Sequence, residues 1–278
     1  MTFFEAFFIA ILQGATELFP VSSLGHAVIV PRLLNWSMDQ KSLAFLPFLV
    51  VLHLGTAVAL LIYFWREWFG FAKAVLGRSK AGKTERRVFL LICIATLPAV
   101  ILGFALEHTL RGFFGSPVLA AVFLIVNGFV LFIGERMRKR AKGQKTVDKI
   151  GWKAALAIGA CQALALIPGI SRSGATMVGG LMAGLTHKDS ARFSFLLATP
   201  VIAGAGVLEV PKLIGLCREG TEVHGGLIVM AGVVAGVTAY LTTALLMRYF
   251  KKHDIEALDP FAWYCWAAGA GVLLIMVI

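Results

Sequence analysis

The chain alternates between long apolar runs and short polar connections. Six runs reach or approach the roughly 20 apolar residues that a membrane-spanning helix needs, and Glu209 is the one charged residue within them. They are Ser42–Trp65, Val88–Leu106, Gly112–Gly134, Phe193–Val210, Gly225–Met247 and Pro260–Ile278. This pattern predicts an all-α polytopic membrane protein with six transmembrane helices in a single membrane domain, residues 1–278.

Two further apolar regions are interrupted by residues that break helices. The first extends from about residue 3 to 34 and contains Pro20 and Gly25, and the second extends from about 152 to 185 and contains Pro168 and Gly169. The backbone groups freed at such breaks need partners inside the protein, because lipid offers none. We therefore expect two re-entrant helical hairpins, each of which enters and leaves the membrane on one face.

Basic residues are concentrated in two connections. Residues 66–87 and residues 135–151 hold seven Lys or Arg each, whereas the connection Glu107–Arg111 between them holds one. Two spans separate the basic connections, so both lie on one face, which the positive-inside rule makes cytoplasmic. Counting the crossings from there places both termini on the periplasmic face and the Lys212–His224 connection outside.

Each half of the chain then consists of one hairpin followed by three spans, in residues 1–137 and 150–278. An odd number of crossings forces the halves into opposite orientations, which predicts an inverted-topology repeat. A constant offset of 149 residues supports it weakly through identical pairs: Ala6 and Ala155, Ile9 and Ile158, Gln13 and Gln162, Ser22 and Ser171, Gly25 and Gly174, and Gly55 and Gly204.

Composition narrows the class of protein. Of the 278 residues 59% are hydrophobic and 15% charged, with a mean hydropathy of +0.84, so the chain cannot form the polar exterior of a soluble protein. The net charge of +11 lies in short connections, which argues against a nucleic-acid partner. The four cysteines lack the spacing of a metal site or a disulfide framework, and we expect them to be small core residues: Cys93, Cys161, Cys217 and Cys265.

Glu17 and Arg172 are the charged residues that lie deep within the two broken regions. A charge at that depth costs several kcal/mol unless it is paired or faces water, so both are candidates for function. The alternative is a structural ion pair that locks the hairpins together. The two interpretations are compatible, because such a pair can open when a substrate enters.

The segment from Pro168 to Thr176, which reads PGISRSGAT, predicts a phosphate-binding site. Ser171 or Ser173 can cap the helix after the break, and its free N–H groups then attract an anion. The Arg172 guanidinium adds a fork that matches two phosphate oxygens. Ser22, Ser173, Gly174 and Thr176 complete the predicted phosphate-binding set. An ordinary helix break with capping serines is the alternative, and Arg172 favours anion binding over it.

The first hairpin offers the chemistry of metal binding, proton transfer and nucleophilic attack. Gln13 and Glu17 lie four residues apart on one helical face, and together they can hold Mg²⁺ or Ca²⁺; Glu17 can instead carry protons. Ser23 begins the outgoing helix and His26 follows about one turn later, which is the minimum for an activated serine. A histidine that only packs is the alternative for His26.

Three other polar residues in apolar segments rank lower. We expect His53 to hydrogen-bond a neighbouring helix, Glu209 to reach interfacial water and Gln162 to bond the broken backbone.

These motifs resemble the undecaprenyl-diphosphate phosphatase family, also called the bacitracin-resistance protein family. The resemblance covers essentially the whole chain and rests on four segments: Gln13–Glu17, Pro20–His26, Pro168–Thr176 and Phe193–Pro200. It implies hydrolysis of a C55 polyprenyl diphosphate to the monophosphate and inorganic phosphate, a divalent cation, an inner-membrane location and a site reached from the outer face. It also implies roles for Glu17, His26 and Arg172, with Ser23 as nucleophile.

The chain departs from the family at two positions. Many members have Glu where this chain has Gln13, which weakens a metal site made of two carboxylates. Leu24 replaces a residue that is often small and polar, which removes one phosphate contact.

Several alternatives stay open at this point. A transporter or flippase for a polyprenyl phosphate lipid would use the same anion site without the chemistry of Ser23. Either the Ser23 hydroxyl or a water activated by His26 can attack the phosphorus. The expected partners are the prenyl lipid and membrane lipids, and a homodimer is left open.

Overall fold

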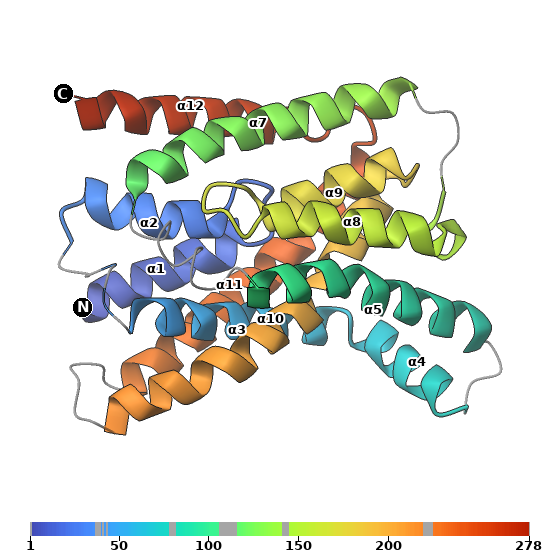
Figure 1. Cartoon of the computed structure of the whole chain (residues 1–278), viewed down its shortest axis with the longest axis horizontal. Coiled ribbons are helices and arrows are strands. Elements are labelled where there is room, and N and C mark those ends of the chain that lie inside the picture. Colours follow the sequence, from blue (N-terminus) through green and yellow to red (C-terminus); the bar gives the residue numbers. More distant parts are fainter. Residues whose placement is uncertain are drawn as a thin grey trace.

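The structure, a computed structural model, describes residues 2–36, 40, 42, 44–77, 82–105, 116–140, 145–218 and 225–277. Within these ranges the chain is helical, with eleven α-helices and one short 3-10 helix (Figure 1). The elements are α1 (Phe3–Thr16), α2 (Ser23–Leu33), α3 (Phe45–Tyr63), α4 (Trp65–Val75), α5 (Gly82–Ala105), α7 (Pro117–Arg140), η1 (Val147–Lys149), α8 (Trp152–Leu164), α9 (Arg172–Met182), α10 (His187–Arg218), α11 (Gly225–Lys252) and α12 (Asp259–Val277).

Six of the described helices are long and apolar enough to cross a membrane, namely α3, α5, α7, α10, α11 and α12. They coincide with the six predicted spans, so the prediction of a multi-pass helical membrane protein is confirmed. Several extend beyond the apolar runs, because backbone hydrogen bonding continues into polar ends. Helix α10, for example, includes Lys212 and Arg218 of the predicted outer connection.

Some features predicted from the sequence fall outside the described residues. They are the connection Glu107–Arg111, residues 219–224 of the connection Lys212–His224, the side chain of Cys217, and Arg78, Lys80 and Lys142 of the basic connections. Of the other cysteines, Cys265 is buried as expected. The prediction of a core position was wrong for Cys93, which is exposed, because one side of α5 faces outward.

The segment after the first span is not a plain connection. Residues 65–75 form α4, an amphipathic helix that buries Phe71 and Ala74 and exposes Trp65 and Phe69. The sequence analysis treated residues 66–87 as a connection and did not predict this helix.

Small residues bring the helices close together. A side chain at Gly14 on α1 would collide with the backbone of Ala235 on α11, and one at Gly159 on α8 would collide with the backbone of Ala95 on α5. Glycine permits this close approach, which apolar helices use to gain packing contacts within lipid. The first helix of each broken region is thus held against a long helix from the other half of the chain.

The two broken regions occupy opposite halves of the molecule. Figure 1 shows α1 and α2 towards one end and α8 and α9 towards the other, with the loops that join each pair near the middle. The start of α1 and the end of α12 lie at the same end. This arrangement brings residues from the two loops together, although about 150 positions separate them in the sequence.

A buried polar cluster joins α7, α10 and the turn after α11, at the end of the molecule opposite the start of α1. His187 on α10 lies between two carboxylates, with Nε2 2.7 Å from Glu135 on α7 and Nδ1 3.2 Å from Asp254 after α11. Arg138 on α7 also pairs with Asp254, at 2.7 Å. The cluster uses residues that the sequence did not single out, and it fixes α7 and α10 relative to the turn before α12.

Candidate active site

Each half-helix that follows a break begins with a capping serine. Ser22 accepts a hydrogen bond from the N–H of Gly25 at 3.2 Å, and Ser171 accepts one from the N–H of Gly174 at 3.1 Å. Of the two predicted capping candidates in the second hairpin, Ser171 is the cap. The two helix N-termini face one cavity, because Ser22 and Ser171 both line it. Helix N-termini carry partial positive charge, so the cavity favours an anion.

Asn127 joins the two breaks from the middle of α7. Its Nδ2 donates to the carbonyl oxygen of Pro20 at 2.9 Å, and its Oδ1 accepts from the N–H of Ser171 at 3.0 Å. Both groups are freed by the helix breaks and would otherwise be buried without partners. One fully buried amide therefore fixes the position of one loop against the other.

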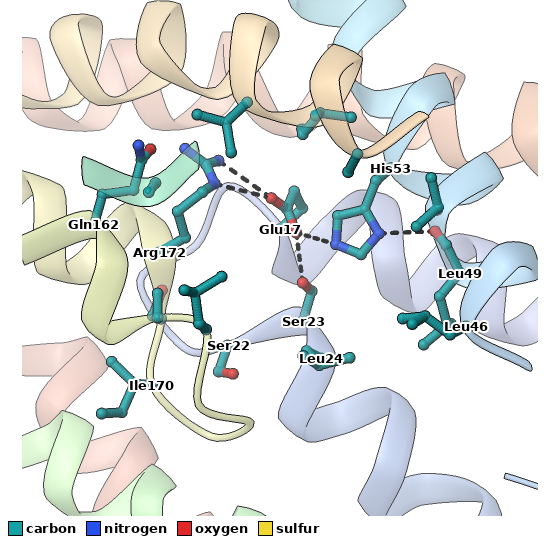
Figure 2. A pocket seen from close by; sticks show the side chains of 18 residues that line it. Glu17, Ser22, Ser23, Leu24, Leu46, Leu49, His53, Gln162, Ile170 and Arg172 are labelled. Carbon is teal, nitrogen blue, oxygen red and sulfur yellow. Dashed lines mark hydrogen bonds and ion pairs between the residues drawn. The ribbon is translucent and has the colours of Figure 1, made fainter. Parts of the chain in front are cut away.

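Glu17 is the centre of the site, and Figure 2 shows its carboxylate between Arg172 and His53. Oε1 accepts from Nε and Nη2 of Arg172, at 3.3 and 3.2 Å. Oε2 accepts from the Ser23 hydroxyl at 2.5 Å and from Nε2 of Gln13 at 3.1 Å. The ion pair between Glu17 and Arg172, which the sequence analysis offered as the structural alternative, is formed between the two broken regions. A carboxylate that receives the hydroxyl of a serine is placed to take its proton.

His53 on α3 belongs to the same cluster, and the expectation that it hydrogen-bonds a neighbouring helix is confirmed, because its partner Glu17 caps α1. Its Nε2 lies 3.2 Å from Oε2 of Glu17, and its Nδ1 lies 2.7 Å from the carbonyl oxygen of Leu49, one turn back on α3. The Leu49 carbonyl and the Glu17 carboxylate both only accept, so Nδ1 and Nε2 each present a hydrogen to their partner. The argument that singled out Glu17, a titratable group deep in an apolar segment, applies equally to His53.

His26 lies close by in the sequence but faces away from the cavity. Its Nδ1 lies 2.7 Å from the carbonyl oxygen of Ser22, and its Nε2 lies 2.8 Å from the hydroxyl of Tyr264 on α12. The imidazole stacks on the Tyr264 ring. The expected contact between Ser23 and His26 is therefore not formed, because bonding back to Ser22 turns the ring towards α12. In its place, the carboxylate of Glu17 receives the serine hydroxyl.

The predicted phosphate-binding residues divide into two groups. Ser22, Ser171 and Arg172 line the cavity. The hydroxyl of Ser173 instead donates to the carbonyl oxygen of Phe19, in the first broken region, at 3.0 Å.

The other two members of that set also act inside the fold. The hydroxyl of Thr176 donates to the carbonyl oxygen of Arg172 at 2.8 Å and lies 2.5 Å from that of Ser194 on α10. Gly174 gives its N–H to the Ser171 cap, and a side chain there would press on Pro20. Ser173, Gly174 and Thr176 thus hold the start of α9 in place.

The cavity has a volume of about 230 Å³, and mostly apolar residues from both halves of the chain line it. Gln162 at the end of α8 is 2% exposed and lines the cavity, yet neither atom of its amide has a hydrogen-bond partner among the described residues. The expectation that it bonds the broken backbone was wrong. A buried amide without partners costs free energy, which a ligand in the cavity would recover.

The expected cation at Gln13 and Glu17 does not fit the side chains as they are arranged. Both oxygens of Glu17 already face donors, two of them on the cationic Arg172. Oε1 of Gln13 is the one orphaned acceptor of this pair within the described chain. No group of three or more His, Cys, Asp or Glu among the described residues could hold a metal ion.

Glu209 is the third of the polar residues that ranked lower in the sequence. Glu209 is 6% exposed and pairs with Lys212 at 2.6 Å, so it does not simply project into interfacial water. It does not line the cavity, whereas Leu24 does.

The fold and the site together define a class: a multi-pass helical membrane protein with a buried, mainly apolar cavity that suits an anion and presents a serine hydroxyl to a carboxylate. The sequence matches the family described as Bacitracin resistance protein BacA over residues 6–271. The chain belongs to this family.

Curated relatives agree with the family. A protein named undecaprenyl-diphosphatase from Acidiphilium cryptum is 54% identical over 99% of both chains. One of the same name from Granulibacter bethesdensis is 52% identical over 98% of this chain and 96% of its own. An undecaprenyl-diphosphatase 2 from Chromobacterium violaceum is 47% identical over the full length of both.

Proposed function

We propose that the chain hydrolyses undecaprenyl diphosphate to undecaprenyl phosphate and inorganic phosphate in the cavity around Glu17. The chain is an enzyme of this type, since relatives named undecaprenyl-diphosphatase match it over nearly the whole of both chains at 52–54% identity. Hydrolysis recycles the lipid carrier for cell-wall synthesis. The membrane-spanning helices place the enzyme where its lipid substrate resides.

A single contact supports the proposed chemistry most directly, namely the 2.5 Å between the Ser23 hydroxyl and Oε2 of Glu17. Ser23 is also the first residue of α2, so its hydroxyl lies at a helix N-terminus that lines the cavity. We assign Ser23 as the nucleophile and Glu17 as its general base. His26 then acts by holding the first turn of α2 rather than by touching the nucleophile.

The reaction proceeds in two displacements. The Ser23 oxygen attacks the terminal phosphorus, its proton passes to Glu17, and the bond to the bridging oxygen breaks. Glu17 returns that proton to the departing undecaprenyl phosphate. Water then attacks the phosphoserine, and Glu17 transfers the proton of that water to the serine oxygen, which releases inorganic phosphate and restores the site.

Arg172 and the two helix N-termini bind the phosphate groups. The Nε and Nη2 groups of Arg172 face Glu17 in the structure. When the substrate enters, these N–H groups turn to phosphate oxygens. The first backbone N–H groups of α2 and α9 have no partners within their helices. The amide of Gln162 completes this binding surface, while the apolar lining accommodates the first part of the prenyl chain.

We further propose that α1–α2 and α8–α9 are re-entrant hairpins of an inverted repeat in the inner membrane, with both termini periplasmic. A pair of contacts supports this. Gly25 closely approaches Gly169, and Gly174 closely approaches Pro20. The two contacts are equivalent under the offset of 149 residues. Gly25 corresponds to Gly174 and Pro20 corresponds to Gly169, so each contact becomes the other when both residues are replaced by their counterparts. We also propose that substrate reaches the cavity from the outer face, as the family resemblance implies.

The divalent cation stays a prediction. In the present arrangement the protein does not form a cation site by itself, so no step above passes through one. An assay of phosphate release with and without a chelator tests the requirement.

The function is tested by phosphate release from undecaprenyl diphosphate, using the purified chain in detergent. We expect Glu17→Gln to lower kcat by about 10²–10⁴-fold, the usual contribution of a general base. Glu209→Gln is the matched control, because Glu209 is also buried in a span but lies outside the cavity. It should retain near-normal turnover.

Two outcomes would contradict the proposal. Near-normal hydrolysis by Glu17→Gln would remove the general base. No phosphate release by the wild-type chain, with transfer of the intact lipid across vesicle membranes, would favour the transporter alternative.

A further inference from the structure

A second cavity, of about 580 Å³, lies beside the first turns of α5. It shares no lining residue with the catalytic cavity. Its other wall comes from Asp148 in η1 and Trp152 at the start of α8. The proposed reaction uses none of these residues.

The mouth of this second cavity is cationic. Lys83, Arg86 and Arg87 are exposed, and their spacing places them on one face of α5. Nη2 of Arg87 donates to the carbonyl oxygen of Ile150 at 3.1 Å, which holds the guanidinium at the cavity. Three cations and one carboxylate give the described lining a net formal charge of +2.

The one carboxylate of that lining, Asp148, is already engaged. The hydroxyl of Thr146 hydrogen-bonds to it and lowers its pKa, so it is ionised at neutral pH. It therefore offsets one of the three cations, and the excess positive charge has no partner in the lining.

The deeper wall is apolar. Leu90, Leu91 and Ile94 continue the same face of α5, about 4–16 Å farther along the helix at 1.5 Å per residue. Helix α5 is long and apolar enough to cross the membrane, and its apolar run begins at Val88, directly after the basic residues. Trp152, 58% exposed, belongs to the residue type enriched at membrane interfaces. The cavity thus changes from charged to apolar where α5 enters the bilayer.

We propose that this cavity binds an anionic phospholipid, with the headgroup phosphate at Lys83, Arg86 and Arg87 and an acyl chain along Leu90 and Ile94. Basic pockets beside transmembrane helices have the charge and position to hold such headgroups. A soluble anion would use the cationic mouth but gain nothing from the apolar wall. A lipid uses both, and the boundary between them matches its own boundary between headgroup and chain.

Binding is tested with the full-length protein, delipidated in detergent and titrated with phosphatidylglycerol or phosphatidylcholine of identical acyl chains, with native mass spectrometry as the readout. We expect the wild type to prefer phosphatidylglycerol at least tenfold. Lys83→Gln/Arg86→Gln/Arg87→Gln should weaken phosphatidylglycerol binding about 10–100-fold. The matched control carries three Lys→Gln changes at exposed residues outside the cavity: Lys188, Lys251 and Lys252.

Three results would overturn the proposal. They are equal binding of the two lipids, equal loss in the pocket and control triples, or unchanged binding in the pocket triple. Arg86→Gln alone, expected to weaken binding about fivefold, covers the case in which the triple fails to fold. Normal phosphate release and thermal melting identify folded variants.

A further experiment distinguishes a site for a phospholipid from a site for a free anion. Leu90→Gln should weaken phosphatidylglycerol binding several-fold, because the apolar wall loses contact with the acyl chain. Inorganic phosphate at millimolar concentration should displace little of the lipid. Full displacement by phosphate, together with no effect of Leu90→Gln, would show a site for a bare anion and would contradict the phospholipid assignment.

Discussion

The two broken regions are built alike but carry different chemistry. Each has a capping serine, a half-helix of 11 residues and a loop that packs on the other. At the first position of the half-helix, however, one has Ser23 and the other Arg172, which lie 149 residues apart. The same offset pairs Glu17 with Leu166, and both line the cavity. The two regions thus provide two helix N-termini, of which the first carries a serine beside a carboxylate and the second an arginine.

The largest effect is expected from removing that positive charge. Arg172→Ala should lower phosphate release by about 10³-fold or more, because an arginine at a phosphoryl group stabilises charge that develops in the transition state. Arg172→Lys should recover only part of this, since an ammonium cannot form the fork.

Arg192→Lys is the control for the arginine prediction. Arg192 pairs with Glu67 outside the cavity, so the same substitution there should leave turnover within about twofold. Near-normal hydrolysis by Arg172→Ala would contradict this difference between the two broken regions, because the charge of the second region would then contribute nothing to catalysis.

An intermediate loss of turnover is expected from substitution of His53. The equivalent position in the second half of the chain, 149 residues later, is the apolar Ile202. His53→Leu removes a polar contact to Glu17 and should lower kcat about 10–30-fold with little change in KM. His53→Gln keeps an N–H group near the carboxylate and should restore most of the turnover. If Leu and Gln at this position behave alike, His53 contributes packing alone.

The smallest effects are expected from substitution of Gln13 and Gln162, which lie 149 residues apart at equivalent positions. The two substitutions should change different kinetic constants. Gln162→Leu should raise KM about five- to tenfold, through the loss of one contact to phosphate, without lowering the melting temperature, since its amide has no partner to lose. Gln13→Leu should instead lower kcat, because its amide donates to Glu17. A fall in stability in Gln162→Leu with unchanged KM would contradict the assignment of Gln162 to substrate binding.

Patterns along the sequence predicted most of the fold. Uninterrupted apolar runs indicate spanning helices, and Pro and Gly within such runs indicate breaks, because both effects are local. The cost of burying an unpaired charge singled out Glu17 and Arg172, and their pairing was one of the two interpretations that this cost allowed. Helix α4 was missed because it is half polar, so the search for apolar runs passed over it.

The rest of the site depends on contacts between distant segments. Asn127 lies 107 residues from Pro20, and nothing in the spacing of the two indicates that they meet. His26 has the right distance from Ser23 in the sequence, but bonding to its own helix turns it to Tyr264. Ring direction is set by local hydrogen bonds that spacing does not reveal.

The most direct measurement is to trap the phosphorylated enzyme. Wild-type protein mixed with undecaprenyl diphosphate, quenched in acid within one turnover and digested for mass spectrometry, should yield a phosphoserine at Ser23. Ser23→Ala should yield none and should lose nearly all turnover, because the hydroxyl that Glu17 activates is gone. If no phosphopeptide forms and Ser23→Ala hydrolyses the lipid at the wild-type rate, a water molecule is the nucleophile and the 2.5 Å contact between Ser23 and Glu17 has no catalytic part.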